Sequence, residues 1–278
     1  MSLEITHQSF GQFSEGGDCL VIELFGDGIS FSEIQSEENR PLFICHYVID
    51  DTVSHTLGEH LTNAIKHFQF YKKTYRYVHV NYSTLQFTVC PTLFSNIEHN
   101  RLLLEFNTGS SGDKIILNDD VNTNITIIYA IEEELKSILD HYFPNHQLRH
   151  TLTVLTKLML FMDELLKENM IVSIHSSHIE VILKQGHSVL LINQYSVKTQ
   201  EDILYYLLFI LEQYQLSPLT VNITLVGNTE SSGNLISSLK KYIKNIRLGI
   251  GHKSIDWTSI KGMPQHFNYT LINRLFCE

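Results

Sequence analysis

The sequence predicts an α/β protein made of two similar halves, and three observations support this prediction. Hydrophobic residues make up 43% of the 278 residues and charged residues only 18%, a composition that can fill a sizeable core. Short runs of apolar and β-branched residues alternate with segments of helical periodicity. The same order of elements, β-β-β-α-β, occurs twice along the chain, with an offset of about 150 residues.

The first half contains a three-stranded meander, a helix and a fourth strand. Its predicted strands are β-rich runs bounded by turn residues: Cys19–Phe25, Ile29–Ile34, Pro41–Ile49 and Tyr75–Tyr82. The turn between the first two strands is Gly26-Asp27-Gly28, which is typical of a hairpin. Leu57, Leu61, Ile65 and Phe68 recur at helical spacing and predict a helix over residues 54–70, with Ser54 as its N-cap.

The second half repeats this order. Its predicted strands are again short apolar runs between turns: Met170–His175, His178–Lys184, His187–Tyr195, Thr220–Val226 and residues 246–250. A helix over Gln200–Tyr214 is expected to begin after the N-cap Thr199. A second helix is predicted over Asn234–Lys244.

The segment between the halves is expected to form a subdomain and connecting helices. Its predicted strands are Ile115–Leu117 and Ile125–Ile131, and its predicted helices are Glu132–Tyr142 and Thr151–Lys167. The predicted domains are therefore residues 1–114, residues 115–167 and residues 168–278.

Charge, cysteine use and hydropathy limit the compartment and the partners. The formal net charge is -10, so no positive field favours nucleic acid or anionic lipid, and neither partner is expected. The four cysteines lack any CxxC pair and are expected to be buried free thiols. The N-terminus lacks the basic start and apolar run of a signal peptide, and no apolar stretch has the length of a membrane span. A cytoplasmic protein is expected.

The element order resembles the ribonuclease H-like domain pair of the actin, Hsp70 and hexokinase superfamily. The bacterial cell-division and pilus-assembly actin homologues resemble it most. The runs Val89–Phe94 and Ile128–Leu135 are similar to those of an uncharacterised bacterial family with a duplicated actin-like fold. This resemblance implies two ribonuclease H-like domains of the actin-like ATPase fold, with an inserted α+β segment.

The resemblance also implies where a nucleotide would bind. ATPases of this superfamily hold phosphates between two hairpin turns, where backbone N–H groups surround the anion and carboxylates position Mg²⁺. The first turn here is Gly26, Asp27 and Gly28, and Glu23 precedes it inside the strand. The second turn, 175–178, has neither a carboxylate nor a glycine, and this departs from the pattern of the superfamily.

A third loop resembles the adenosine-binding motif. It spans residues 226–233 and contains Gly227, Asn228 and Gly233, with Asn228 where the motif has its second glycine. The expected ligand-binding residues are these three and the Gly26–Gly28 turn, gathered in a cleft between the halves. ATP with Mg²⁺ is the cofactor that such a cleft would take.

No catalytic or metal-binding residues are predicted from the remaining motifs. The 15 histidines form no HExxH motif, and His175 and His178 have no third ligand that the sequence identifies. His60 and His67 are expected on an exposed helix face. Asp119 and Asp120 resemble solvated acids, and neither a GxSxG elbow nor a base for Cys90 is identifiable.

The sequence favours a non-enzymatic protein of actin-like fold that acts as a scaffold or binding protein for an unidentified protein partner. The missing features of the second turn favour this hypothesis, because a fold alone does not carry an activity. The alternative is an ATP-binding protein or weak ATPase that acts as a nucleotide-gated switch. The oligomeric state is not predicted.

Overall fold

The structure, a computed structural model, describes residues 7–11, 16–26, 28–49, 55–162, 168–229, 234–260 and 262–277. The chain forms two compact units. The first unit comprises Met1–Val154, Lys253–Met263 and Thr270–Glu278, and the second comprises Leu155–His252 and Pro264–Tyr269. The predicted division at residues 114 and 167 stays a prediction.

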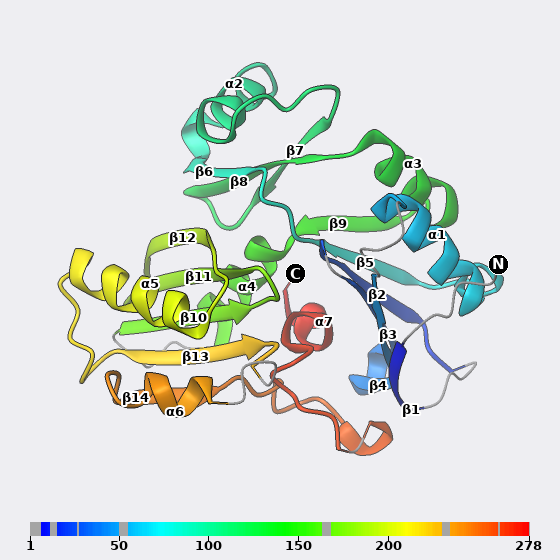
Figure 1. Cartoon of the computed structure of the whole chain (residues 1–278). Coiled ribbons are helices and arrows are strands. Elements are labelled where there is room, and N and C mark those ends of the chain that lie inside the picture. The colour runs from blue at the N-terminus through cyan, green and yellow to red at the C-terminus, as the bar shows by residue number, and fades with distance from the viewer. Residues whose placement is uncertain are drawn as a thin grey trace. The chain divides into compact units, whose positions relative to one another are not determined.

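A six-stranded sheet forms the centre of the first unit, in the order β1-β4-β3-β2-β5-β9 (Figure 1). β2 is antiparallel to β3 and parallel to β5, and β5 is parallel to β9. The strands are β1 His7–Gly11, β2 Cys19–Leu24, β3 Gly28–Gln35, β4 Arg40–Val48, β5 Tyr77–Tyr82 and β9 His146–His150. The four predicted strands of the first half are thus confirmed within two residues at each end.

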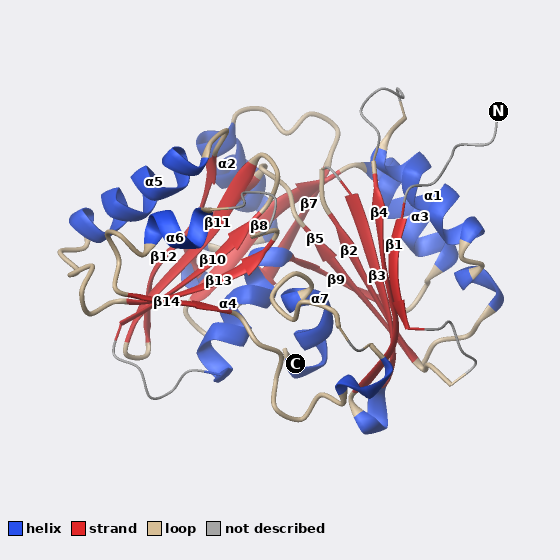
Figure 2. Ribbon diagram, turned by 60° about the horizontal axis from the view of Figure 1, so that its bottom comes forward, coloured by secondary structure: helices blue, strands red, loops and turns tan. Residues whose placement is uncertain are grey.

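Helices α1 (Leu57–His67) and α3 (Glu133–Tyr142) lie side by side on this sheet (Figures 1 and 2). A Cβ atom at Gly58 would lie 2.8 Å from Cδ1 of Ile138, so the small residue allows the two helices to approach closely. The chain's C-terminal segments also belong to this unit, where Leu271 and Ile272 pack with Cys19 and Val21 of β2 in one apolar cluster.

Two predictions about α1 are wrong. The N-cap is Thr56 rather than Ser54, which lies outside the described residues. Thr56 Oγ1 accepts a hydrogen bond from Glu59 N, and the Glu59 carboxylate accepts one from Thr56 N. His60 is buried rather than exposed, and its Nδ1 lies 3.0 Å from the hydroxyl of Tyr47. The helical spacing correctly predicted that Leu61 is buried. It could not show that His60 would also be buried, because the partner of His60, Tyr47, lies on another element, β4. His67 is exposed, as predicted.

The first unit also contains a small antiparallel sheet in the order β6-β8-β7. Its strands are β6 Phe87–Pro91, β7 Ile115–Asp120 and β8 Ile125–Ile131. Helix α2 (Ile97–Thr108) packs on it through the buried side chain of Leu104 and begins at the N-cap Asn96. Neither β6 nor α2 was predicted.

A five-stranded sheet forms the centre of the second unit, in the order β12-β11-β10-β13-β14. The strands are β10 Glu168–Ile174, β11 His178–Gln185, β12 Ser188–Ser196, β13 Asn222–Gly227 and β14 Asn245–Leu248. Helices α5 (Gln200–Gln213) and α6 (Leu235–Leu239) bury Leu207 and Leu239 in the core of this unit. On the other side of β11, Lys184 Nζ donates to the carbonyl of Met159 in α4 (Thr151–Met162).

Five adjacent strands of the first sheet, β4-β3-β2-β5-β9, follow the same order as the five strands of the second sheet. In each, an antiparallel meander, β4-β3-β2 or β12-β11-β10, continues into two parallel strands. This agrees with the predicted repeat, although a duplication as the origin of the two halves stays a prediction.

Two helices differ from the prediction in length. The predicted helix 234–244 ends early because the chain after Leu239 forms tight turns and returns to the sheet, where Lys244 N donates to Pro218 O. The helix from Thr151 is described only to Met162. Short helices complete the fold: α7 Tyr269–Asn273 and the 3₁₀ turns Ser36–Glu38, Phe70–Lys72, Thr92–Phe94, Trp257–Ser259 and Arg274–Phe276.

The four cysteines are buried free thiols, as predicted. Among the helices of the described ranges, none combines the length and the apolar character that crossing a membrane requires.

Candidate functional site

The turn between β2 and β3 contains Gly26 and Gly28 of the first unit. Phe25 N donates to Gly28 O across the turn, and Gly26 is exposed. A Cβ atom at Gly28 would lie 2.9 Å from Cε1 of His46 and 3.0 Å from the carbonyl oxygen of Tyr47. Strand packing therefore already explains a glycine at position 28. Asp27 lies outside the described residues.

Glu23, the carboxylate next to this turn, is engaged within the protein. It is buried on β2, and the hydroxyl of Thr270 donates a hydrogen bond to its Oε1. This contact joins β2 to the C-terminal segment of the first unit. Glu23 therefore has a structural role that the sequence did not reveal.

The turn between β10 and β11 lies in the second unit. His175 N donates to His178 O, and Ser177 O accepts from Val197 N. The exposed tip is Ser176 and Ser177. The tip thus has the small polar residues of a tight turn, but no carboxylate that would position Mg²⁺ and no glycine that would open the backbone to a phosphate.

Gly227 ends β13 against the end of β10. Its φ angle is +80°, and a Cβ atom there would lie 2.4 Å from Ile174 O. Its N–H donates to His266 O at 2.7 Å, and the N–H of Asn228 donates to Ile174 O at 2.8 Å. Both N–H groups are therefore bonded to carbonyl groups of the same unit. Gly227 therefore permits the close approach of β13 to β10. The sequence had predicted instead that this glycine lets a nucleotide approach the backbone.

The predicted ligand-binding residues divide between the two units. Gly26 and Gly28 belong to the first unit, and Gly227 and Asn228 to the second. Gly233 lies outside the described residues. Their grouping in one cleft between the halves stays a prediction.

Two open cavities of the second unit flank helix α6. One, of about 570 Å³, is lined by His175 and Ser176, the first residues of α5, and Asn234. The other, of about 530 Å³, is lined by Thr229, His266 and one face of α6. Just before α5, the N–H groups of Lys198 and Thr199 already donate to the carboxylate of Asp202, and the N–H of Asp202 donates to the hydroxyl of Thr199.

A partly buried polar network in the first unit surrounds Asp119, which the sequence placed among solvated acids. Asp119 Oδ2 accepts a hydrogen bond from His150 N at 2.6 Å and another from the Thr153 hydroxyl at 3.1 Å, and Oδ1 lies 3.4 Å from the hydroxyl of Tyr129. Burial raises the pKa of this carboxyl to about 6, although the hydrogen bonds act in the opposite direction. The expectation of a solvated acid is wrong.

Asp119 also lines a cavity of about 370 Å³ together with Tyr129, Lys136 and His146. A carboxyl with a pKa near neutrality in a cavity is a candidate acid or base. Here, however, its donors come from the end of β9 and the start of α4, so it ties the small sheet to the central part of the first unit. The sequence signal was weak, because nothing near Asp119 identifies residues about 30 positions later as its partners.

A candidate third ligand that the sequence did not identify lies beside His175 and His178. It is the Glu180 carboxylate, which shares their face because residues two apart on a strand point to the same side. The sequence search looked for distant ligands and overlooked this near one.

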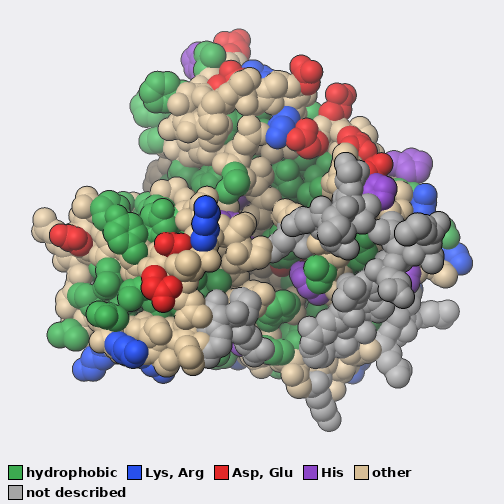
Figure 3. Space-filling view, viewed as in Figure 1, with side chains coloured by type: hydrophobic (Ala, Val, Ile, Leu, Met, Phe, Trp, Pro, Cys, Tyr) green, Lys and Arg blue, Asp and Glu red, His purple; other side chains and the backbone are tan. Residues whose placement is uncertain are grey.

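An apolar surface lies on α2 and the turn before it. The α2 surface, as we call it, is formed by five exposed side chains: Leu93, Phe94, Ile97, Leu102 and Phe106. Ile97 is 94% exposed and Phe106 89%. Hydrophobic side chains gather over α2 in the space-filling view (Figure 3). An exposed apolar group of this kind is typical of a protein interaction surface.

Comparisons with known proteins agree with the architecture. The family model described as "Protein of unknown function (DUF3822)" matches residues 7–246. A crystal structure from Bacteroides thetaiotaomicron, of a protein with actin-like ATPase fold and unknown function, is similar over 96% of this chain and 100% of its own, with a TM-score of 0.82 and 21% identity. No curated protein matches the sequence.

Two further structures share the fold at lower similarity. A type IV pilus biogenesis complex, PilM–PilN, contains a chain that is 13% identical, with a TM-score of 0.66, covering 94% of this chain and 99% of that one. The ethanolamine utilization protein EutJ from Carboxydothermus hydrogenoformans has a TM-score of 0.51 at 7% identity, covering 93% of this chain and 89% of its own. The fold is therefore the actin-like ATPase fold, as the element order had indicated.

Proposed function

This chain belongs to the DUF3822 family of proteins of unknown function, and we propose that it is a non-enzymatic cytoplasmic binding protein that holds a protein partner on the α2 surface. The observation that carries the proposal is the exposure of five large apolar side chains on and beside a helix that is itself anchored by Leu104. Water contact at such a group is unfavourable, and a partner with an apolar face would remove it.

The hydrogen bonds that hold α2 in place support this role. Asn100, in the first turn of α2, is buried, and its Oδ1 accepts hydrogen bonds from Asn96 N and from the hydroxyl of Ser95. Arg101, near the middle of α2, donates to the carbonyls of Gly112 and Lys114 in the segment that follows the helix. The α2 surface is thus carried by a helix that is hydrogen-bonded at its start and to the segment after it, and a fixed surface loses little conformational entropy on binding.

The nucleotide-binding features support a function without ATP. The β10–β11 turn lacks the carboxylate and glycine that a phosphate site needs, and the N–H groups of Gly227 and Asn228 are bonded to the protein itself. PilM, a structural neighbour of this chain, occurs in a complex with a second protein, PilN. This is a use of the same fold in which a protein partner is bound.

We expect the double substitution Ile97→Ser and Phe106→Ser to abolish capture of the partner from native cell extract. Truncation of buried anchor residues at an interface typically costs 2 kcal/mol or more, which is about 30-fold in affinity. The stability should stay within about 0.5 kcal/mol, because both side chains are exposed in the unbound protein. Partner capture and urea unfolding are measured on the same preparations.

The matched control is Leu219→Ser, which removes a 65%-exposed apolar side chain from the second unit. It should capture the partner like the unsubstituted protein. Equal capture by the α2 double variant would contradict the proposal. A difference in sedimentation between the purified unsubstituted protein and the purified double variant would show that the α2 surface binds a second copy of this chain instead.

The alternative function is a nucleotide-gated switch. The observation that favours it is the pair of cavities at the end of the second sheet, next to Thr229 and Asn234. The two functions predict different results in one experiment: partner capture depends on Mg-ATP if the protein is a nucleotide-gated switch, and does not depend on it under the proposal.

A further inference from the structure

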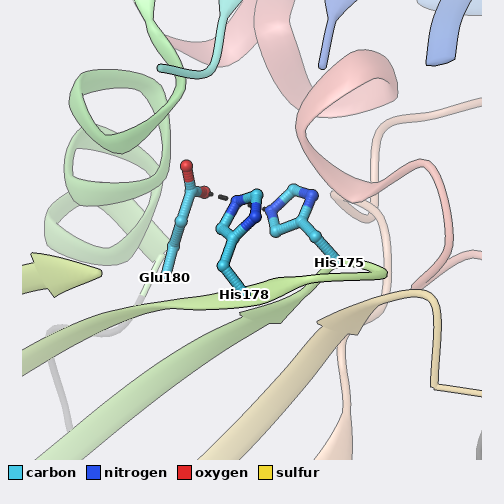
Figure 4. A group of neighbouring side chains, drawn as sticks. All are labelled: His175, His178 and Glu180. Carbon is cyan, nitrogen blue, oxygen red and sulfur yellow. Dashed lines mark ion pairs between the residues drawn. The ribbon is translucent and has the colours of Figure 1, made fainter. Parts of the chain in front are cut away.

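Three side chains with metal-binding atoms meet near the tip of the β10–β11 hairpin. They are His175, His178 and Glu180, and their nearest ligand atoms all lie within 4.8 Å of one another (Figure 4). All three belong to the second unit, so the cluster lies within one compact body.

The strand register explains why these side chains share a face. Ser173 pairs with Glu180 and Ile174 with Ile179 across the hairpin, and His175 N donates to His178 O one step further. Alternation along each strand then places both histidines and Glu180 on one side. Ile174 and Ile179 point to the other side, where they join the core with α5 and α6. Figure 4 shows the three side chains projecting together from the hairpin.

The geometry is close to that of an ion site. His175 Nε2 lies 3.4 Å from Glu180 Oε2. Two ligands about 2.1 Å from one tetrahedral zinc ion are separated by about this distance. The rings of His175 and His178 stack with centroids 4.3 Å apart and 10° between their planes. Since parallel rings do not aim their lone pairs at one point, one imidazole has to tilt when an ion binds.

The electrostatic environment favours a cation. Glu180 is fully buried, and a buried carboxylate is stable only beside a compensating positive charge. In the metal-free protein, His175 stands beside it, and the hydroxyl of Ser173 lies 3.1 Å from His175 Nε2. A divalent ion in this position would satisfy the carboxylate and both imidazoles at once.

We propose that His175, His178 and Glu180 bind one divalent transition-metal ion, with zinc as the expected species. Two imidazole nitrogens and one carboxylate suit zinc, whereas Mg²⁺ and Ca²⁺ require oxygen ligands throughout. Three protein ligands leave a fourth position open. In such a site a water molecule or a substrate group takes the open position.

The test is calorimetric titration of the metal-free full-length chain with Zn²⁺ in the presence of excess Mg²⁺. We expect one equivalent of zinc to bind and Mg²⁺ not to compete. His175→Ala and His178→Ala should each weaken this binding by more than about tenfold, since even the loss of a supporting residue costs that much. Co²⁺ should give the visible absorption bands of a tetrahedral nitrogen and oxygen site, and these bands should vanish in both variants.

His187→Ala is the matched control, because His187 is an exposed histidine in the turn at the other end of β11. It should bind zinc like the unsubstituted protein. Glu180→Gln tests the carboxylate, and if that buried substitution prevents folding, the two histidine variants decide the result alone. Binding that Mg²⁺ abolishes, the absence of binding at one equivalent, or equal binding by His175→Ala and His178→Ala would each overturn the proposal.

Discussion

Replacing Gly227 with alanine is expected to unfold or severely destabilise the second unit. The substitution places a Cβ atom 2.4 Å from Ile174 O, at a residue whose φ is +80°. The left-handed backbone costs about 1–2 kcal/mol for a residue with a side chain, and relief of the clash requires that β13 move away from β10. That movement also breaks the hydrogen bond from Asn228 N to Ile174 O. A total loss of more than about 3 kcal/mol follows.

Gly186→Ala is the control for the backbone contribution. Gly186 also has a positive φ, +57°, but no atom lies within 4 Å of a Cβ atom built there. Gly186→Ala should therefore lower the free energy of unfolding, measured in urea, only by this backbone cost of about 1–2 kcal/mol. Equal losses for the two variants would contradict a clash at Gly227. The comparison also means that a bulky residue at 227, such as valine, reports on folding of the second unit before it reports on nucleotide binding.

Asp119 is expected to make the stability of the first unit fall as the pH rises from about 4 to about 6. Its pKa in the folded protein is about 6, compared with the ordinary pKa of 3.8 that an aspartate has in an unfolded chain. Between these values the folded state holds more protons, so a rise in pH favours unfolding. The stabilisation is complete below the pKa that Asp119 has in the unfolded chain, and it is lost as the pH rises through the pKa of Asp119 in the folded protein. The shift corresponds to a change on the order of 2–3 kcal/mol.

The measurement compares urea unfolding of the protein and of Asp119→Asn at pH 4, 5, 6 and 7. Asparagine keeps an oxygen acceptor for His150 N and Thr153 but does not titrate. The stability of the unsubstituted protein relative to this variant should therefore decrease with pH. If it increased instead, the three hydrogen-bond donors would outweigh burial and hold the pKa of Asp119 below its usual value.

The sequence identified the main sheets well because their signals are local. β2, β3 and β10 to β12 are short apolar runs between turn residues, and α5 begins at the predicted Thr199, whose hydroxyl accepts from Asp202 N. The order of these elements was enough to indicate the actin-like fold. No alignment or long-range contact was needed for that step.

The sequence failed where partners are distant or the local pattern is misleading. α2 has the exposed apolar residues Ile97, Leu102 and Phe106 beside the buried Leu104, so it lacks the periodicity of a helix with a single buried stripe. β9 has the sequence HQLRH, which reads as a polar loop, yet it pairs with β5. Gly227 was interpreted as a nucleotide-binding residue, although its nearest neighbours come from β10 and from His266.

The central claim is that this actin-like fold binds its partner without a nucleotide. The most direct measurement is the thermal unfolding of the full-length protein with and without Mg-ATP, followed by an assay for released phosphate. A ligand at 100 times its dissociation constant stabilises a folded protein by about 2.7 kcal/mol, which is a measurable rise in melting temperature. We predict no rise and no phosphate. A clear rise would contradict the claim, and a rise with phosphate release would identify the protein as an ATPase.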